Sequence, residues 1–170
     1  MKTFIILSEK EWHKDMYLSL KKNNAGHQWV LIDDKDDFNI DNIQDHNPEK
    51  VFIPHWSDII PEDIFNSYEC IVFHMTDLPY GRGGSPLQNL IIRGFTETKI
   101  SAIKVDIGLD TGDIYLKEKL SLHGTAQEIF LRSSMVIEKM IEKIINENTI
   151  PTKQVGEGSY FKRRKPSDGD

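Results

Sequence analysis

Short apolar runs alternate with longer amphipathic segments along most of this chain. Apolar runs of strand length occupy residues 3–7, 29–32, 51–53 and 70–73, and polar or amphipathic stretches separate them. Parallel strands that are buried on both faces read as continuous apolar runs, and each parallel pair needs a long crossover between its strands. The alternation therefore predicts an α/β fold, with βα units arranged around a largely parallel sheet.

The helices expected around these strands carry recognisable end signals. A capping box of Thr125 and Glu128 opens a long C-terminal helix, which Asn148 and Pro151 end. Earlier helices are expected over residues 9–22, over residues 61–68 with Pro61 in the first turn, and from Pro86 to Gly94 with Ser85 as the cap. Two strands over residues 100–105 and 114–122 form a hairpin, and the acidic segment 33–50 is interpreted as a mobile connection.

The chain has 170 residues, a net charge of −6 and a single cysteine, Cys70. This length suits one domain over residues 1–170, with a glycine-rich and then basic tail over residues 152–170. The negative charge argues against a general affinity for nucleic acid, and one cysteine excludes a disulfide framework or a cysteine zinc site. The N-terminal apolar run is too short for a signal peptide and no later run could span a bilayer, so we expect a cytoplasmic protein without a membrane partner.

The pattern that indicates chemistry begins at His74, directly after the apolar run 70–73. Ligands collect beyond the carboxyl ends of parallel strands, which is where this histidine is expected. The glycine-rich loop 81–84 that follows leaves backbone amides bare and leads into a helix N-terminus, where an anion or a polarised carbonyl could dock. A solvated histidine beside a flexible loop is the plain alternative, and Arg82 is either an anion ligand or a solvated side chain.

Asp110 lies on the turn of the expected hairpin and could fold back towards His74. Acidic residues in turns often serve only the turn itself, so both roles stay open. The aspartates of this turn lack the alternate spacing of a calcium loop, and His55, His74 and Asp77 make a poor zinc set, so no metal is expected. The chain also lacks a Gly-Lys-Ser/Thr phosphate loop and a G-x-S-x-G nucleophile elbow, which excludes those two classes of enzyme.

Two motifs taken together resemble the folate-dependent formyltransferases. They are His74-x-Thr76-x-Leu78-Pro79 with Arg82-Gly83 and Pro86, and later Leu109-Asp110-Thr111-Gly112-Asp113 before a strand. The resemblance covers residues 55–122 well. The closing string Gly158-Ser159-Tyr160-Phe161-Lys162-Arg163-Arg164 resembles the tail of the sugar N-formyltransferases. The longer string 74–90 is most similar to the compact sugar N-formyltransferases of the pseudaminic-acid pathway type and to the formylation domain of linear gramicidin synthetase.

The resemblance implies a Rossmann-like formyltransferase fold, with a mostly parallel twisted sheet flanked by helices, a C-terminal β-hairpin and a long helix. It also implies transfer of a formyl group from N10-formyltetrahydrofolate to an amine, with no metal. His74 takes the family's histidine position, from which it would relay protons or donate to the developing oxyanion, and Asp110 takes the aspartate position, from which it would orient His74. The family asparagine two residues before the histidine is replaced by Val72, and Thr76, Asn89 or a loop amide is the expected substitute donor.

The binding residues are implied by the same resemblance. The segment ahead of the catalytic strand is expected to hold the folate through Trp56, Ser57, Asp58 and Ile59, while Gly108 and Leu109 close the other side. A core aromatic is the alternative interpretation of Trp56. The substrate is expected to lie against Thr76, Arg82, Gly83 and Ser85.

The similarity to sugar enzymes implies that the acceptor is an amino sugar of the 4-amino-4,6-dideoxy type, carried on a nucleotide and used for a surface glycan. Transfer RNA is not expected as a partner, because the net charge is negative and the second domain of the tRNA enzymes is missing. A carrier-bound aminoacyl group is the alternative acceptor. A non-catalytic module that binds folate or a nucleotide is the alternative function, and a homodimer is left open.

Overall fold

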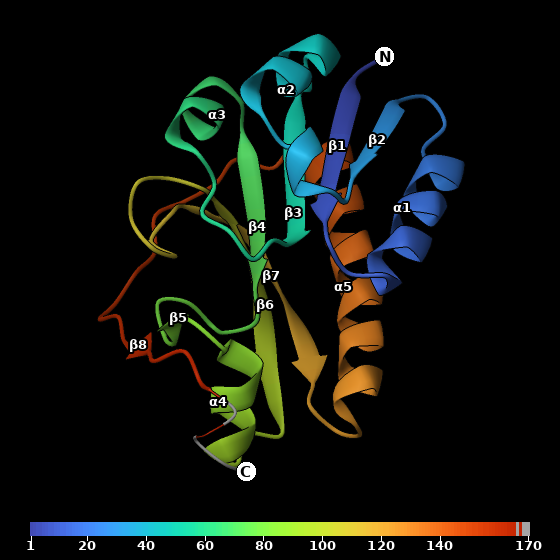
Figure 1. Cartoon of the computed structure of the whole chain (residues 1–170). Coiled ribbons are helices and arrows are strands. Elements are labelled where there is room, and N and C mark those ends of the chain that lie inside the picture. The colour runs from blue at the N-terminus through green and yellow to red at the C-terminus, as the bar shows by residue number, and fades with distance from the viewer. Residues whose placement is uncertain (166, 168–170) are drawn as a thin grey trace.

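The computed structural model describes residues 1–165 and 167 and is built around a six-stranded sheet (Figure 1). The elements in chain order are β1 Thr3–Ser8, α1 Trp12–Asn23, β2 Gln28–Ile32, η1 Lys35–Asp37, α2 Ile40–His46, β3 Lys50–His55, α3 Glu62–Ser67, β4 Cys70–His74, β5 Arg82–Gly83, α4 Pro86–Ile92, β6 Glu97–Lys104, β7 Ile114–Ser121, α5 Ala126–Glu147 and β8 Tyr160–Phe161. The strand order across the sheet is β2-β1-β3-β4-β6-β7. The first four of these strands run parallel, and β6 pairs antiparallel with both β4 and β7. The expected α/β fold with a mostly parallel sheet and a hairpin is confirmed.

Alternate residues of the parallel strands face two separate cores, because successive side chains of a strand point to opposite faces of the sheet. On β1, Phe4 and Ile6 join the core that α1 and α5 cover, whereas Ile5 and Leu7 join the core that α2 and α3 cover (Figure 1). All four side chains are at most 1% exposed. Burial on both faces requires apolar residues at every position, which explains why the strands appear in the sequence as unbroken apolar runs.

The segment 33–50 forms secondary structure, so its interpretation as a mobile connection is wrong. It contains η1 and α2, and α2 begins where the side-chain oxygen of Asn39 accepts a hydrogen bond of 2.9 Å from the Asn42 amide. Ile43 of α2 is fully buried in the second core. The many acidic and amide side chains of this segment cap short helices, and one buried isoleucine is enough to attach α2 to the sheet.

The long helix α5 has the ends that its sequence predicts. The Thr125 hydroxyl accepts a hydrogen bond of 3.2 Å from the Glu128 amide, and the Glu128 carboxylate accepts one of 3.1 Å from the Thr125 amide. Asn148 ends the helix with a φ of 53° in the left-handed region. Although α5 has 22 residues, neither it nor another described helix is long and apolar enough to cross a membrane.

The segment after α5 returns to the loop that follows β4 (Figure 1). Thr152 and Ile114 exchange two backbone hydrogen bonds of 2.7 and 2.9 Å, and β8 then pairs parallel with β5. The sequence indicated only a glycine-rich and basic tail here, and its residues 166 and 168–170 lie outside the described part of the chain. The tail therefore adds a short strand next to the glycine-rich loop.

Candidate active site

His74 is the last residue of β4, at the carboxyl end of the parallel part of the sheet. It lies opposite Ser101 of β6 and is 8% exposed. Its Nε2 atom lies 2.7 Å from the carbonyl oxygen of Gly81. A carbonyl oxygen only accepts hydrogen bonds, so Nε2 carries a proton and donates it to Gly81. In the neutral ring Nδ1 is then the atom with a free lone pair.

Asp110 comes from the turn between β6 and β7 and places its carboxylate beside His74. Its Oδ2 atom lies 3.7 Å from His74 Nδ1 and accepts a hydrogen bond of 2.9 Å from the Gly83 amide. Asp110 has a φ of 54°, in the left-handed region that aspartate enters more readily than most residues. The structure therefore brings together the two residues that the sequence predicts to be catalytic, and adds a backbone donor from the glycine-rich loop.

The turn that carries Asp110 lies very close to β6. A Cβ atom added to Gly112 would lie 1.7 Å from the carbonyl oxygen of Lys104. A Cβ atom added to Gly108 would lie 2.1 Å from the hydroxyl of Thr111. The obstructing atom at Gly112 belongs to the backbone and cannot rotate away, so only glycine fits there. The glycine of the Asp110 motif therefore serves a close backbone approach.

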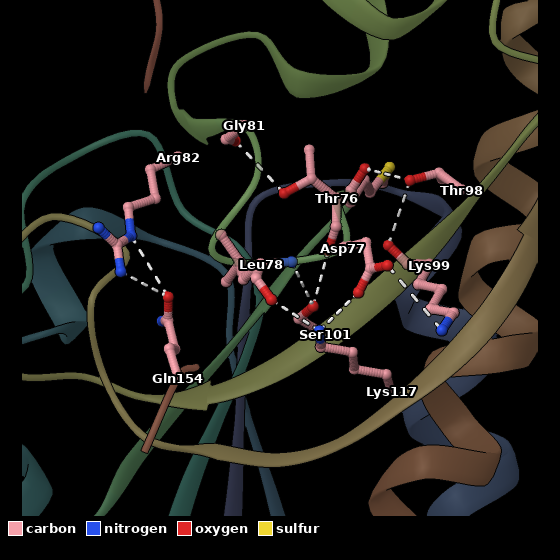
Figure 2. A network of polar contacts seen from close by, with 11 residues as sticks. Thr76, Asp77, Leu78, Gly81, Arg82, Thr98, Lys99, Ser101, Lys117 and Gln154 are labelled. Carbon is pink, nitrogen blue, oxygen red and sulfur yellow. Dashed lines mark hydrogen bonds and ion pairs between the residues drawn. The ribbon is translucent and has the colours of Figure 1, made fainter. Parts of the chain in front are cut away.

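The loop after β4 is anchored by side chains of β6 and β7, as Figure 2 shows. The Ser101 hydroxyl donates to the Thr76 carbonyl at 2.7 Å and accepts from the Leu78 amide at 3.4 Å. The Lys117 ammonium donates to the Leu78 carbonyl at 2.6 Å. Thr76 is fully buried, and its hydroxyl donates to the same Gly81 carbonyl that His74 contacts, at 3.3 Å. These bonds fix the path of the loop, which includes a cis peptide between Leu78 and Pro79.

The other residues predicted to bind substrate lie on the far part of the same loop. The Arg82 guanidinium donates to Gln154 Oε1 at 2.8 and 3.3 Å, and the Gly83 amide donates to the carboxylate of the neighbouring turn. Ser85 does not cap α4 as expected. It has a φ of 52°, and its hydroxyl accepts a hydrogen bond of 3.0 Å from the Arg164 amide. The contacts of Arg82, Gly83 and Ser85 with a substrate stay predictions.

Two residues of the tail belong to this site and were missed in the sequence. Gln154 contacts Arg82, as described above. The hydroxyl of Ser159 accepts a hydrogen bond of 2.9 Å from the Gly81 amide, and its carbonyl accepts one of 2.9 Å from the Arg82 amide. Ser159 lies in the string that contributed to the family resemblance, which was a usable signal. Nothing in a single sequence marks Gln154.

The segment predicted to bind folate directly follows β3. The ring of Trp56 packs edge-on against Phe38 with centroids 5.3 Å apart, and Trp56 joins the second core. The amide and hydroxyl of Ser57 donate to the Glu9 carboxylate at 2.9 and 2.7 Å, and these bonds lower the pKa of Glu9. Asp58 forms an ion pair of 3.0 Å with a lysine of η1. These contacts hold the segment at the end of β3, and its role in folate binding stays a prediction.

Three apolar side chains around the predicted folate site are exposed. Ile59 is 92% exposed on the loop after β3, and Ile107 and Leu109 are 86% and 62% exposed on the turn that carries Asp110. Covering such side chains with the flat face of a heteroaromatic ring removes apolar surface from water, which is favourable by roughly 25 cal/mol for each Å² of apolar surface buried. These residues are suited to contact the flat face of a pteridine ring, and their role in folate binding stays a prediction.

The structure shows where Val72 and Asn89, one of the expected substitutes for the family asparagine, lie and what they contact. Val72 lies in the middle of β4 and packs against the second core. The amide nitrogen of Asn89 donates to the carbonyls of Gly84, Ser85 and Lys162 at 3.2, 2.9 and 3.0 Å, so its donors are used at the start of α4. A backbone amide of the glycine-rich loop is left as the expected donor to the developing oxyanion.

Two further histidines are buried or half-buried near the carboxyl ends of the parallel strands, His13 in the first turn of α1 and His55 at the end of β3. Ser8 Oγ lies 2.5 Å from His13 Nδ1, and Ser8 is in register with His55. Burial lowers the pKa of His13 to about 4, and burial together with Lys10 lowers the pKa of His55. His13 is 3% exposed and is neutral at pH 7. Within residues 1–165 and 167, no three His, Cys, Asp or Glu side chains are grouped so that they could hold a metal ion.

The low pKa of His13 predicts a loss of stability in mild acid. Between pH 6.5 and pH 4 the unfolded chain binds a proton at this histidine and the folded chain does not. The free energy of unfolding should therefore fall by about 3 kcal/mol across this window, at 1.36 kcal/mol for each pH unit. Urea unfolding of the wild type and of His13→Gln at several pH values measures this, and the variant should show a shallower pH dependence. His123→Gln, on the surface, should keep the wild-type slope, and equal slopes for all three proteins would contradict the prediction.

The arrangement defines a class of protein. A histidine at the end of a buried parallel strand, a glycine-rich loop and an aspartate on a hairpin turn lie together on a Rossmann-like α/β fold, which is the layout that the resemblance to formyl-transferring enzymes predicts. The chain belongs to the formyl transferase family, whose match covers residues 33–135. Members of this family use N10-formyltetrahydrofolate as the formyl donor.

Known proteins of this family are similar over most of the chain. A methionyl-tRNA formyltransferase from Clostridium botulinum is 32% identical over 140 residues, which cover 78% of this chain and 45% of that protein. The structure of a methionyl-tRNA formyltransferase from Clostridium thermocellum is 49% identical, with a TM-score of 0.96 over 99% of this chain and 75% of that one. The formyltransferase PseJ from Anoxybacillus kamchatkensis, solved with a UDP-linked formamido sugar and tetrahydrofolate, has the same fold at 18% identity and a TM-score of 0.70, over 94% of this chain and 85% of that one.

These relatives correct the expected partners. The similarity to proteins named methionyl-tRNA formyltransferases overturns the expectation of an amino-sugar partner with no nucleic acid. The net charge was misleading because it averages over the chain and hides a local run of cations over residues 162–165. The lack of a second domain was also a weak argument, because the chain spans under half the length of the curated relatives that it matches.

Proposed function

We propose that this chain carries the formyl-transfer site of an enzyme that formylates the α-amino group of methionyl-tRNA. The observation that supports this most directly is the contact of the Asp110 carboxylate with both His74 Nδ1 and the Gly83 amide. The relatives at 32% and 49% identity support the acceptor. N10-formyltetrahydrofolate supplies the formyl group when it is bound.

His74 and Asp110 form the proton-handling part of the site. His74 Nδ1 has a free lone pair, because Nε2 donates to Gly81, and it can accept the proton that the attacking amine loses. Asp110 Oδ2, at 3.7 Å from Nδ1, stabilises the positive charge that the ring then carries. The same proton is later given to the nitrogen that leaves the formyl carbon, so the imidazole returns to its starting state.

The glycine-rich loop supplies backbone donors beside this pair. The amides of Gly81 and Gly83 already donate to Ser159 and Asp110 and so hold the loop in place, and another backbone amide of this loop is the expected donor to the formyl oxygen. Fixed donors stabilise negative charge that develops on the formyl oxygen without the need to reorganise solvent. Ile59, Ile107 and Leu109, which are exposed, would cover the ring system of the donor.

Cations of the tail suit a nucleic-acid acceptor. Lys162, Arg163 and Lys165 are exposed and directly follow β8, which pairs with β5 of the glycine-rich loop. A Cβ atom on Gly84 would lie 2.9 Å from the Arg163 Cβ, which shows how closely the basic run packs on the loop. Positive charge at this place would contact phosphates near the aminoacylated end of a tRNA.

The acceptor is tested by formyl transfer to a panel of amines. The full chain is incubated with N10-formyltetrahydrofolate and methionyl-tRNA, free methionine, or a nucleotide-linked 4-amino-4,6-dideoxy sugar, and each product is analysed by mass spectrometry. A gain of one formyl group on methionyl-tRNA alone is expected. Transfer to the sugar and not to the tRNA would overturn the acceptor, and binding of tetrahydrofolate without transfer to any amine would overturn the catalytic function.

A further inference from the structure

We propose that Gln154 is a positioning residue for formyl transfer, which holds the Asp110 carboxylate at its place beside His74. This inference rests on the function proposed above. Gln154 is half-buried in the tail between α5 and β8. Its carboxamide joins the glycine-rich loop to the turn that carries Asp110.

Every polar contact of the carboxamide has a defined direction. Oε1 accepts hydrogen bonds from Arg82 Nη2 at 2.8 Å and from Arg82 Nε at 3.3 Å. Nε2 donates to the carbonyl oxygens of Asp110 and Gly112, both at 2.9 Å. A guanidinium only donates and a carbonyl only accepts, so the orientation of the carboxamide is fixed by chemistry. Figure 2 shows the oxygen of Gln154 directed at the Arg82 guanidinium.

These contacts close a ring around the carboxylate. Gln154 binds the side chain of Arg82, the next residue Gly83 donates its amide to Asp110 Oδ2, and the backbone carbonyl of Asp110 returns to Gln154. The distance of 3.7 Å between Asp110 Oδ2 and His74 Nδ1 is too long for a hydrogen bond that could hold the carboxylate by itself. The ring is therefore the arrangement that sets this distance.

The tail is fixed on both sides of Gln154, so the carboxamide is presented by a rigid segment. Two residues before it, Thr152 exchanges backbone hydrogen bonds of 2.7 and 2.9 Å with Ile114 of β7. Five residues after it, Ser159 donates its amide to the Pro79 carbonyl at 3.2 Å and accepts from the Arg82 amide at 2.9 Å. Positional errors of about 1 Å in a catalytic group can lower a rate by about 100-fold, so a fixed carboxamide has a direct effect on catalysis.

The variant Gln154→Glu distinguishes the role of the side-chain oxygen, which binds Arg82, from the role of the side-chain nitrogen, which donates to two backbone carbonyls. The variant keeps an oxygen that can pair with Arg82, but it replaces the amide donor with a carboxylate oxygen facing two carbonyls at 2.9 Å. We expect kcat to fall by about 10- to 100-fold and the dissociation constant of tetrahydrofolate to rise by much less, because Ile107 and Leu109 of the loosened turn form only part of the expected folate site. Gln154→Met, which is uncharged and similar in length, should also lower kcat with only a small change in folate affinity. Gln44→Glu, on an exposed face of α2, is the matched control and should behave as the wild type.

Hydrogen exchange of the unliganded protein gives a second measurement that does not depend on the acceptor. In Gln154→Glu the backbone amides of residues 106–113 should exchange faster, while those of α5 keep their wild-type protection. Unchanged exchange in residues 106–113, or an unchanged kcat, would overturn the positioning role. A wild-type protein that transfers no formyl group to any amine would instead refute the proposed function, and the exchange measurement would still decide whether Gln154 fixes the turn.

Discussion

Replacing His74 with alanine should lower kcat for formyl transfer by about 1,000-fold, within the range of 10²- to 10⁴-fold that general acid–base catalysis contributes. The variant lacks the Nδ1 lone pair that accepts the proton of the attacking amine. KM for the folate donor should change by less than about threefold, because the exposed residues expected to bind the ring, Ile59, Ile107 and Leu109, are untouched. Steady-state kinetics with methionyl-tRNA as acceptor measures both constants.

The side chain of His74 is buried and bonded to Gly81, so loss of folding must be separated from loss of chemistry. His74→Gln serves this purpose, because its amide can still donate to the Gly81 carbonyl but cannot act as a base near neutral pH. It should be as inactive as His74→Ala with a melting temperature closer to that of the wild type. His123→Ala, which changes an exposed histidine, should keep full activity. Substantial turnover in the folded His74 variants would show that His74 is not the catalytic base.

Asp110→Asn should lower kcat by about 100- to 1,000-fold with little effect on folding. Asparagine has the same shape, tolerates the left-handed backbone at this position, and can still accept the hydrogen bond from the Gly83 amide. What it lacks is the negative charge beside His74 Nδ1, so the protonated ring is no longer stabilised. Asp106→Asn is the control within the same turn, because Asp106 is exposed and its side chain accepts hydrogen bonds from Gly108 and Thr111.

The readout for Asp110 is kcat against KM, measured together with thermal unfolding. A fall in kcat at unchanged KM and melting temperature supports a role in the chemical step. If Asp110→Asn and Asp106→Asn lost activity equally, the carboxylate of Asp110 would be a part of the turn and not of the reaction. That is the alternative interpretation that the sequence left open.

The parallel strands could be predicted from the sequence because burial on both faces of the sheet requires an unbroken run of apolar residues. Ile5 and Ile6 of β1 face opposite cores, and both must be apolar. The sequence of α2 contains no such run, because Ile43 is the one buried residue of this helix and most of its neighbours are polar. Composition alone could not distinguish a short capped helix from a mobile connection.

His74 and Asp110 could be predicted from the sequence, whereas the residues of the tail that contact the same loop and turn could not. His74 follows a strand that the sequence marks, and Asp110 lies in a motif that resembles a known family. Gln154 and Ser159 act through tertiary contacts across the loop, and the strands that align them, β5 and β8, have two residues each. Pairings this short depend on the packing around them and have no periodic pattern of their own.

The position of β8 along the chain has a consequence for the order of synthesis. Every strand of the large sheet precedes α5, so the strands of this sheet are synthesised before residues 148–165. The loop after His74 gains its contacts with Gln154 and Ser159 only when that later segment has been made. Cleavage shortly after α5 would therefore leave all six strands of the sheet in place and would remove the tail contacts that hold the loop after β4 and the Asp110 turn.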